Sequence, residues 1–254
     1  MSATLPRIAG NWALFLDVDG TLLDIAARPD GARVPAGLRE VLTALSQRLG
    51  GALALVSGRT IASVDRLFKP LLLPAAGQHG AELRRSAQEQ VQRVECGVDF
   101  EPFRAPLEHF ASAWPGIQIE WKGQSLAVHC REAPGSRGEL GVLLADLAGK
   151  ADGIVVMDSR SGFDLRPTVV SKGSAVEWFL GEPPFRGRIP VFAGDDITDE
   201  SGFAAALRHH GIAIRVGGDG KSLALLRVAQ PAEFRAWLSQ SAGAPETRAS
   251  GDAR

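Results

Sequence analysis

The stretch that decides the fold is residues 12–20, WALFLDVDG, in which a run of five apolar residues leads into two carboxylates and a glycine. A short continuous apolar run is typical of a β-strand that is buried on both faces, as in a parallel sheet. Open α/β sheets bind their ligands at the C-terminal ends of such strands. The stretch therefore predicts a parallel sheet with chemistry at the end of its first strand.

Outward from this strand, apolar runs and helical stripes alternate along the chain. We expect helices and strands in turn over residues 35–49, 52–56, 61–68 and 71–76. The same alternation returns near the end, with expected elements over residues 172–180, 189–193, 198–207, 212–216 and 232–240. Helices that alternate with short apolar strands predict a doubly wound, Rossmann-like parallel sheet.

Between about residues 101 and 167 the alternation gives way to an αββαββ pattern. Its expected elements are a helix and two strands, then again a helix and two strands, over residues 101–114, 117–121, 125–131, 136–147, 154–158 and 162–166. We therefore predict a discontinuous α/β core over 1–100 and 168–240, and an inserted α+β domain over 101–167. The small, polar residues 241–254 predict a disordered tail.

Composition excludes several classes of function. The 254 residues include 28 Lys and Arg against 29 Asp and Glu, and a nucleic-acid partner would need a basic excess. No apolar run approaches the roughly 20 residues of a membrane span, and residues 1–10 do not resemble a signal peptide. Cys96 and Cys130 are far apart and imply neither a disulfide framework nor a zinc site. We expect a cytoplasmic protein with a small-molecule substrate and no membrane or nucleic-acid partner.

Asp17 and Asp19 are the first candidate site residues. Two positions apart on an extended strand, their side chains point to the same side. Such a pair suits a hard cation with oxygen ligands, or a nucleophile beside a general acid/base. A solvated acidic turn is the better interpretation of Asp-Xaa-Asp-Gly in isolation. The apolar strand before the pair, and Thr21-Leu22 after it, favour a functional site.

Four motifs together resemble those of the haloacid-dehalogenase-like (HAD) phosphohydrolases. They are residues 17–21 (DVDGT), residues 57–59 (SGR), Lys172 at a helix start, and residues 194–200 (GDDITDE). Taken singly, Ser57 would be a turn residue, Lys172 a solvated residue, and the acids of the last motif helix caps. The four occur in the family's order, each at an expected strand end or helix start, and that agreement favours the resemblance.

The resemblance implies a phosphatase mechanism. Asp17 would attack phosphorus and form an aspartyl-phosphate, while Asp19 would protonate the leaving oxygen and later deprotonate the hydrolytic water. Ser57 would donate a hydrogen bond to a phosphoryl oxygen, and Lys172 would place a positive charge beside the same oxygens. Because phosphoryl transfer depends mostly on positioning and charge stabilisation, these residue types suit it.

The resemblance also implies a Mg²⁺ cofactor. The carboxylates of Asp17 and Asp195 and the backbone carbonyl of Asp19 would ligate it, with waters in the remaining positions. Asp196 and Asp199 would orient those waters or the lysine.

The insertion lies between the second and third motifs, as in the type IIB caps of sugar phosphatases. Finer features resemble the trehalose-6-phosphate phosphatase family: residues 77–82 (GQHGAE), 122–131 (KGQSLAVHCR) and 164–167 (DLRP). The resemblance extends from Asp17 to about Leu238. It implies a phosphorylated disaccharide as substrate, the last step of trehalose biosynthesis as reaction, and a trehalose-phosphate synthase as functional partner.

The same resemblance implies Lys122, His129 and Asp164 as contacts to the disaccharide. Asp164 departs from the family pattern, which commonly has Glu there, so its reach is shorter by one methylene. From the residues alone, Lys122 is equally a hairpin residue and His129 equally a structural histidine. His79 and Arg59 would line the sugar pocket or support its loops, with loop support favoured for Arg59.

Three alternatives stay open at this point. A HAD phosphatase for another sugar phosphate, such as a sucrose or glycosyl phosphate, would share the core motifs and differ in the cap residues. A phospho-accepting receiver domain would be far shorter and would lack the insertion. A non-catalytic sugar-binding relative would lack a nucleophile or a metal ligand, whereas Asp17, Asp19 and Asp195 are all present.

Overall fold

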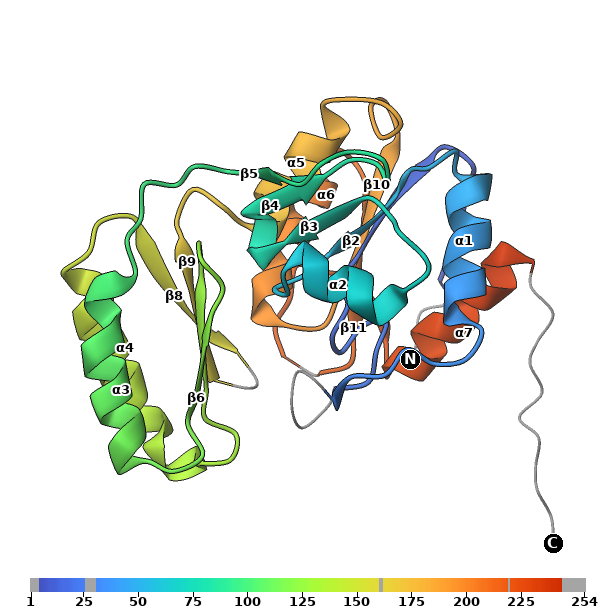
Figure 1. Ribbon diagram of the computed structural model, residues 1–254. Helices are drawn as coiled ribbons and strands as arrows, with labels where there is room; N and C mark the ends of the chain where they lie inside the picture. The colour runs from blue at the N-terminus through green and yellow to red at the C-terminus, as the bar shows by residue number, and fades with distance from the viewer. Residues whose placement is uncertain (1–4, 26–30, 160–161, 219, 244–254) are drawn as a thin grey trace, which may run out of the picture.

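The computed structural model describes residues 5–25, 31–159, 162–218 and 220–243. These residues form two separate sheets, which Figure 1 shows side by side. The first sheet has the strand order β12-β11-β10-β1-β2-β3-β4-β5. Its strands are β1 (Trp12–Leu16), β2 (Leu53–Val56), β3 (Ala75–Gly77), β4 (Glu82–Arg84), β5 (Gln92–Arg93), β10 (Ile189–Gly194), β11 (Ile212–Val216) and β12 (Leu226–Val228). From β12 to β3 neighbouring strands are parallel, and β4 and β5 add an antiparallel edge.

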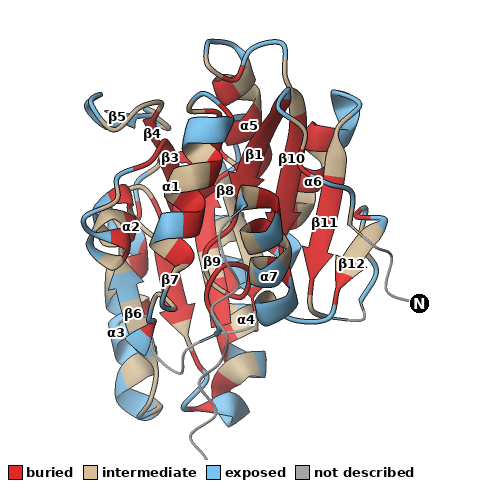
Figure 2. Cartoon of the chain, turned by 90° about the vertical axis from the view of Figure 1, so that its right-hand side faces the viewer, coloured by how far each residue is buried: buried red, intermediate tan, exposed pale blue. Residues whose placement is uncertain are grey.

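Helices cover both faces of this sheet. α1 (Leu38–Arg48) and α7 (Pro231–Ala242) pack together on the face turned toward the viewer in Figure 2. α5 (Lys172–Leu180) and α6 (Glu200–Arg208) pair on the other face, and α2 (Ile61–Phe68) lies beside β3. The buried residues of α1 are spaced at three and four positions, so they form one apolar stripe against the sheet.

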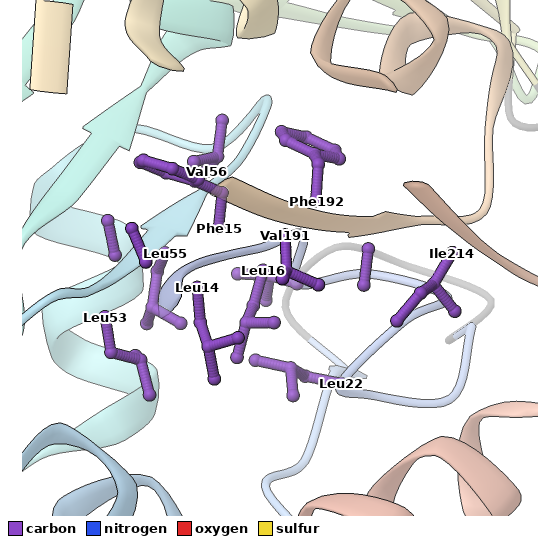
Figure 3. Close-up of a cluster of buried hydrophobic side chains, with 14 of the residues drawn as sticks. Leu14, Phe15, Leu16, Leu22, Leu53, Leu55, Val56, Val191, Phe192 and Ile214 are labelled. Carbon is purple, nitrogen blue, oxygen red and sulfur yellow. The ribbon is translucent and has the colours of Figure 1, made fainter. Parts of the chain in front are cut away.

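The centre of the first sheet is buried on both faces. Every residue of β1 is buried, as its continuous apolar run predicts. Phe15 contacts Phe179 of α5, with ring centroids 5.8 Å apart. Leu14 and Leu16 lie on the opposite side of the same strand (Figure 3). Side chains of β1 thus pack against helices on both faces of the sheet. This packing fixes the position of β1 and of the loop that follows it.

The second sheet contains β6 (Gln118–Trp121), β7 (Leu126–His129), β9 (Gly162–Pro167) and β8 (Ile154–Ser159) in that order. Its strand pairs are antiparallel. α3 (Arg104–Ala113) and α4 (Arg137–Gly149) cover the face that is turned away from the first sheet in Figure 1. Apolar residues between these helices and strands form a core of their own, which includes Leu107, Leu144 and Leu165. The expected inserted α+β unit and its αββαββ order are therefore present.

Several boundaries differ from the sequence prediction. The strand expected over 71–76 is confined to Ala75–Gly77, because Pro74 interrupts the apolar run and proline cannot donate to a ladder. β4, β5 and β12 were not expected, since strands of two or three residues carry no readable periodicity. The predicted parallel sheet is confirmed, and β4 and β5 extend it by an antiparallel edge.

The remaining helices were close to prediction. The helices expected from residues 101 and 198 begin with short 3₁₀ turns, Glu101–Phe103 and Ile197–Asp199. α7 continues to Ala242, two residues past its expected end at 240, and residues 244–254 of the expected tail lie outside the described residues. Among the described helices, none combines the length and the apolarity that crossing a membrane requires.

Candidate active site

The pocket lies where strand ends of the first sheet converge. β1 pairs with β10 on one side and β2 on the other, so Leu16 is in register with both Ala193 and Leu55. The residues that follow these strands are therefore neighbours although they are far apart in sequence. The second sheet closes the pocket from the other side. Most predicted site residues line it: Asp17, Asp19, Ser57, Arg59, His79, Lys122, His129, Asp164, Lys172, Asp195 and Asp196.

A buried cluster of charged side chains forms the floor of the pocket. Carboxylate oxygens of Asp17, Asp195 and Asp199 lie within 4.8 Å of one another. The Nζ of Lys172 donates to Oδ1 of Asp17 at 2.7 Å and to Oδ1 of Asp199 at 2.6 Å. The other oxygen of Asp17, Oδ2, is buried without a hydrogen-bond partner. Three carboxylates against one ammonium leave an excess of negative charge, and a bound cation would offset it.

The electrostatics of this cluster follow from its burial. Burial raises the pKa of Asp17 well above its ordinary value, and Lys172 opposes that rise only in part. For Lys172, burial acts to lower the pKa, but Asp17 and Asp199 outweigh it, so the pKa is raised. The lysine is therefore an ammonium at neutral pH. A further positive charge beside the unpaired Oδ2 would keep Asp17 ionised, and its oxygen donors suit Mg²⁺.

Local structure holds the two ends of the cluster. Lys172 is the first residue of α5, and Ser171 before it forms a reciprocal capping box with Ser174 after it. A lysine there opposes the helix dipole, and its pairs with Asp17 and Asp199 offset that cost. In the loop after β10, Oδ2 of Asp199 accepts hydrogen bonds from the backbone N–H groups of Asp195 and Asp196, both at 2.9 Å.

The loop after β1 approaches the loop after β10 very closely. Gly20 has a φ of +87°, and a Cβ atom there would lie 2.3 Å from Oδ2 of Asp195. Glycine satisfies both demands because it has no Cβ and populates positive φ freely. This close approach brings Asp195 beside Asp17, and it explains the glycine of the first motif.

Asp19 and Arg59 form an ion pair at the side of the pocket. Nε and Nη2 of Arg59 donate to the two carboxylate oxygens of Asp19 at 2.6 and 2.7 Å. Both residues were expected in the site, but this pairing was not expected. Ser57 is buried beside them, and its Oγ accepts a hydrogen bond from the backbone N–H of Arg59 at 3.1 Å.

Polar residues of the second sheet form the roof of the pocket. The Nζ of Lys122 donates to the carbonyl oxygen of Gly58 at 3.2 Å and lies 3.9 Å from Asp164. Nε2 of His129 lies 3.2 Å from Oε2 of Glu120, which also pairs with Lys122 at 3.4 Å. Lys122 therefore touches both sides of the pocket, from the second sheet to the loop after β2.

His79 and Asp164 face each other at 3.8 Å between Nε2 and Oδ1, beyond hydrogen-bond distance. Burial lowers the pKa of His79, so the imidazole is neutral at pH 7. Burial acts to raise the pKa of Asp164, but His79 and Lys122 outweigh it, and the carboxyl pKa is lowered. The pair presents an ionised carboxylate and a neutral imidazole to the pocket.

Sequence reasoning missed several pocket residues, namely Gln118 and Glu120 of β6 and Arg131 and Glu132 in the loop after β7. A signal for two of them was available. The alternation of a strand places Gln118, Glu120 and Lys122 on one face, so the assignment of Lys122 extends to both earlier residues. Among the predicted site residues, Asp199 does not line the pocket. It lies beneath the pocket floor, where it accepts a hydrogen bond from Lys172.

Comparison with known proteins agrees with this geometry. A family model described as trehalose-phosphatase matches residues 15–227. A probable trehalose-phosphate phosphatase of Sinorhizobium fredii is 44% identical over 208 residues, covering 82% of this chain and 78% of its own. The trehalose-6-phosphate phosphatase of Escherichia coli is 36% identical, over 92% and 87% of the two chains.

Solved structures share the fold. The C-terminal domain of Candida albicans trehalose-6-phosphate phosphatase superposes with a TM-score of 0.83 at 19% identity, over 93% of each chain. A phosphatase of the HAD superfamily from Bacteroides thetaiotaomicron gives a TM-score of 0.62 at 16% identity, over 96% of this chain and 99% of its own. At these identities the likeness shows the fold, an α/β core with an inserted α+β unit.

Proposed function

The chain belongs to the trehalose-phosphatase family and is a phosphatase, and from that premise we propose that it hydrolyses trehalose 6-phosphate to trehalose and phosphate. The observation that carries the proposal is the pocket itself. A buried carboxylate and lysine cluster forms its floor, and polar groups of the second sheet form its roof. The floor suits a phosphoryl group, and the roof suits sugar hydroxyls.

The chemistry proceeds in two displacements. A carboxylate oxygen of Asp17 attacks phosphorus, and the bond from phosphorus to the sugar oxygen breaks as Asp19 gives that oxygen its proton. Water then attacks the phosphorus of the aspartyl-phosphate, and Asp19 takes the water's proton. Phosphate leaves and the Asp17 carboxylate is restored. Because Asp19 is paired with Arg59 in the structure, this ion pair must open, and Asp19 must take up a proton from solvent, before it can protonate the leaving oxygen.

A Mg²⁺ ion would be held by the carboxylates of Asp17 and Asp195 and by the backbone carbonyl of Asp19. It would polarise the phosphoryl oxygens and offset the charge that develops on them. The partnerless Oδ2 of buried Asp17 and the excess of carboxylates support this assignment. Asp196 and Asp199 hold the loop that presents Asp195, and Asp199 also holds Lys172.

The remaining pocket residues bind the substrate. Ser57 and Lys172 face the phosphoryl group from the first sheet. Lys122, His129 and Asp164 face the disaccharide from the second sheet, together with His79 and Glu120. A site built of hydrogen-bonding groups discriminates strongly against analogues that leave those groups unpaired.

The setting of the reaction completes the proposal. We place the enzyme in the cytoplasm, where a trehalose-phosphate synthase would supply its substrate as the reaction's functional partner. The family's reaction supports both statements.

The test is phosphate release from trehalose 6-phosphate, sucrose 6-phosphate and glucose 6-phosphate, each with Mg²⁺ and with EDTA. We expect the highest kcat/KM on trehalose 6-phosphate and no turnover in EDTA. Equal or better kcat/KM on another sugar phosphate would overturn the substrate assignment.

Asp17→Asn tests the mechanism in the same assay. The amide cannot act as the nucleophile, so we expect turnover to fall by about a thousandfold or more. Asp152→Asn changes an exposed carboxylate in the turn between α4 and β8 and serves as the matched control. Full turnover in Asp17→Asn would exclude Asp17 as the nucleophile.

A further inference from the structure

A chain of buried hydrogen bonds joins the two sheets beside the pocket. Oγ of Ser125, the residue before β7, donates to Oε1 of Gln78 at 2.9 Å. Nε2 of Gln78 donates to Oε1 of Glu82 at 2.9 Å. The second oxygen of Glu82 accepts a hydrogen bond from the backbone N–H of Ile61 at 2.8 Å, at the start of α2. Ser125, Gln78 and Glu82 are all buried, so this chain is shielded from competing water.

The direction of these hydrogen bonds is determined by chemistry. An ionised carboxylate only accepts hydrogen bonds, so the amide nitrogen of Gln78 must face Glu82. The amide oxygen then faces Ser125, whose hydroxyl must donate. Loss of the Ser125 hydroxyl would leave the buried Oε1 of Gln78 without a donor. The free-energy cost of such an unpaired buried acceptor exceeds that of losing a hydrogen bond at the surface. Gln78 thus links the second sheet to the core through a hydrogen bond in which Ser125 is the donor and Gln78 the acceptor.

The backbone at Gln78 is also unusual. Gln78 and His79 have φ values of +48° and +58°, the left-handed region that non-glycine residues rarely adopt. Such strain persists only where surrounding contacts hold it. The backbone N–H of Gln78 donates to the carbonyl of Arg59 at 2.8 Å, and that of His79 donates to the carbonyl of Ser57 at 3.0 Å. The strained turn is therefore attached to the loop that carries Ser57 and Arg59.

The strained turn presents His79 to the pocket. Both ring nitrogens of His79 are buried without a hydrogen-bond partner, and a buried polar atom left unpaired is costly. A sugar hydroxyl between His79 and Asp164 would pair Nε2, the ring nitrogen that faces Asp164. Gln78 itself does not line the pocket, and neither does Ser125. Their contribution must act through the position of the turn.

We propose that Gln78 is a positioning residue: through Ser125 it seats the second sheet over the pocket and holds the turn that aims His79 at the sugar. The identity of the sugar rests on the proposed function, whereas the coupling between the two sheets does not. The hairpin that carries Ser125 has a second attachment to the core, from Lys122 to the carbonyl of Gly58. Loss of the Gln78 contact is therefore expected to loosen the seating of the second sheet without releasing it.

The test compares Gln78→Met, Ser125→Ala and the double variant. Methionine keeps the length of glutamine and removes its hydrogen bonds, and Ser125→Ala removes the contact without changing the strained turn. We expect KM for trehalose 6-phosphate to rise about tenfold, the size of one buried acceptor left unpaired. Turnover of p-nitrophenyl phosphate, which has no sugar to bind, should stay near wild type. The double variant should match Gln78→Met, because both changes remove one shared interaction.

Amide hydrogen exchange supplies a readout that is independent of activity. We expect faster exchange over residues 78–82 and 122–126 in both single variants, with α7 unchanged. Gln47→Met on the exposed side of α1 and Ser112→Ala on the exposed side of α3 are the controls. If Gln78→Met fails to fold, Ser125→Ala decides the matter alone.

Wild-type KM and wild-type exchange in Ser125→Ala would overturn the proposal, as would additive effects in the double variant. Failure of the proposed function is distinguishable from this outcome. In that case the wild-type enzyme would prefer another sugar phosphate, while the exchange over residues 78–82 and 122–126 would still respond to Ser125→Ala.

Discussion

At the scale of single residues, Lys172 bridges two carboxylates, those of Asp17 and Asp199, in the pocket floor. Its ammonium and the two carboxylates that it bridges are almost completely buried. A buried ion pair gives little net stability by itself, but removal of one partner leaves an uncompensated charge. Lys172 therefore ties the stability of the pocket floor to its function.

Lys172→Met should lower the free energy of unfolding by about 3–5 kcal/mol in EDTA, because Asp17 and Asp199 lose their shared cation. Excess Mg²⁺ should restore part of this loss, since a ligand that binds the folded state stabilises it. Urea unfolding with and without Mg²⁺ measures both effects. Lys150→Met, which removes an exposed pair with Asp146, should cost less than about 1 kcal/mol. Equal losses in the two variants would contradict the argument.

His79 should make stability depend on pH. Because burial lowers its pKa in the folded state, the unfolded chain takes up the proton first as pH falls below about 6.5. The stability present above that pH is then lost toward the lower folded-state pKa, by at most about 1.4 kcal/mol per pH unit. His79→Gln should flatten urea unfolding free energies between pH 7 and 5. The exposed His109→Gln should not, and an unchanged slope in His79→Gln would refute the assignment.

At the scale of elements, the pocket depends on two loops that follow adjacent parallel strands. The loop after β1 contributes Asp17 and Gly20, and the loop after β10 contributes Asp195. β1 and β10 are in register, so their ends meet at one edge of the sheet. A change in either loop should therefore alter the other.

Gly20→Ala tests this contact, and Gly37→Ala provides a matched control. Both glycines have positive φ, +87° and +79°, but an added Cβ meets Asp195 only at Gly20 and meets nothing within 4 Å at Gly37. Both variants should lose about 1 kcal/mol of stability from backbone strain. Gly20→Ala alone should also raise the half-saturating Mg²⁺ concentration for phosphate release, by about tenfold or more. The same Mg²⁺ dependence in both variants would show that the contact is unimportant.

At the scale of the whole molecule, the residues that the structure describes form two apolar cores. One lies around the eight-stranded sheet and the other between the four-stranded sheet, α3 and α4. We propose on this basis that residues 101–167 form a cap domain and that residues 1–100 and 168–240 form the phosphatase core. Because the two cores are separate, we expect that a substitution that destabilises one leaves the amides of the other protected from hydrogen exchange.

Leu144→Ala in α4 and Leu45→Ala in α1 test this division, since both leucines are fully buried in different cores. Each substitution should lower the unfolding free energy of the core that contains it by about 2–5 kcal/mol. Hydrogen exchange in Leu144→Ala should increase over residues 101–167 while β1 and β10 stay protected. Uniform acceleration across the chain in Leu144→Ala would mean that the two parts unfold as one unit.

The amino-acid sequence by itself determined the order of the long elements and the loops that bear the chemistry. The apolar run before Asp17 and the stripe of α1 are local patterns, so they can be recognised without a partner. The same holds for Asp17, Ser57 and Asp195 at strand ends and for Lys172 at a helix start, because all four belong to motifs at element boundaries. The short edge strands β4 and β5 lie below the length at which such patterns exist.

Only the tertiary structure decided which side chains pair. Lys172 meets Asp17 across 155 positions of the chain, and Arg59 meets Asp19 across 40. Ser125 meets Gln78 across the junction of the two sheets. Hydrophobic periodicity reports which face of an element is buried, but it carries no information about which distant polar group arrives there. That information resides in the register of the strands and the seating of the second sheet, which arise from packing of the whole chain.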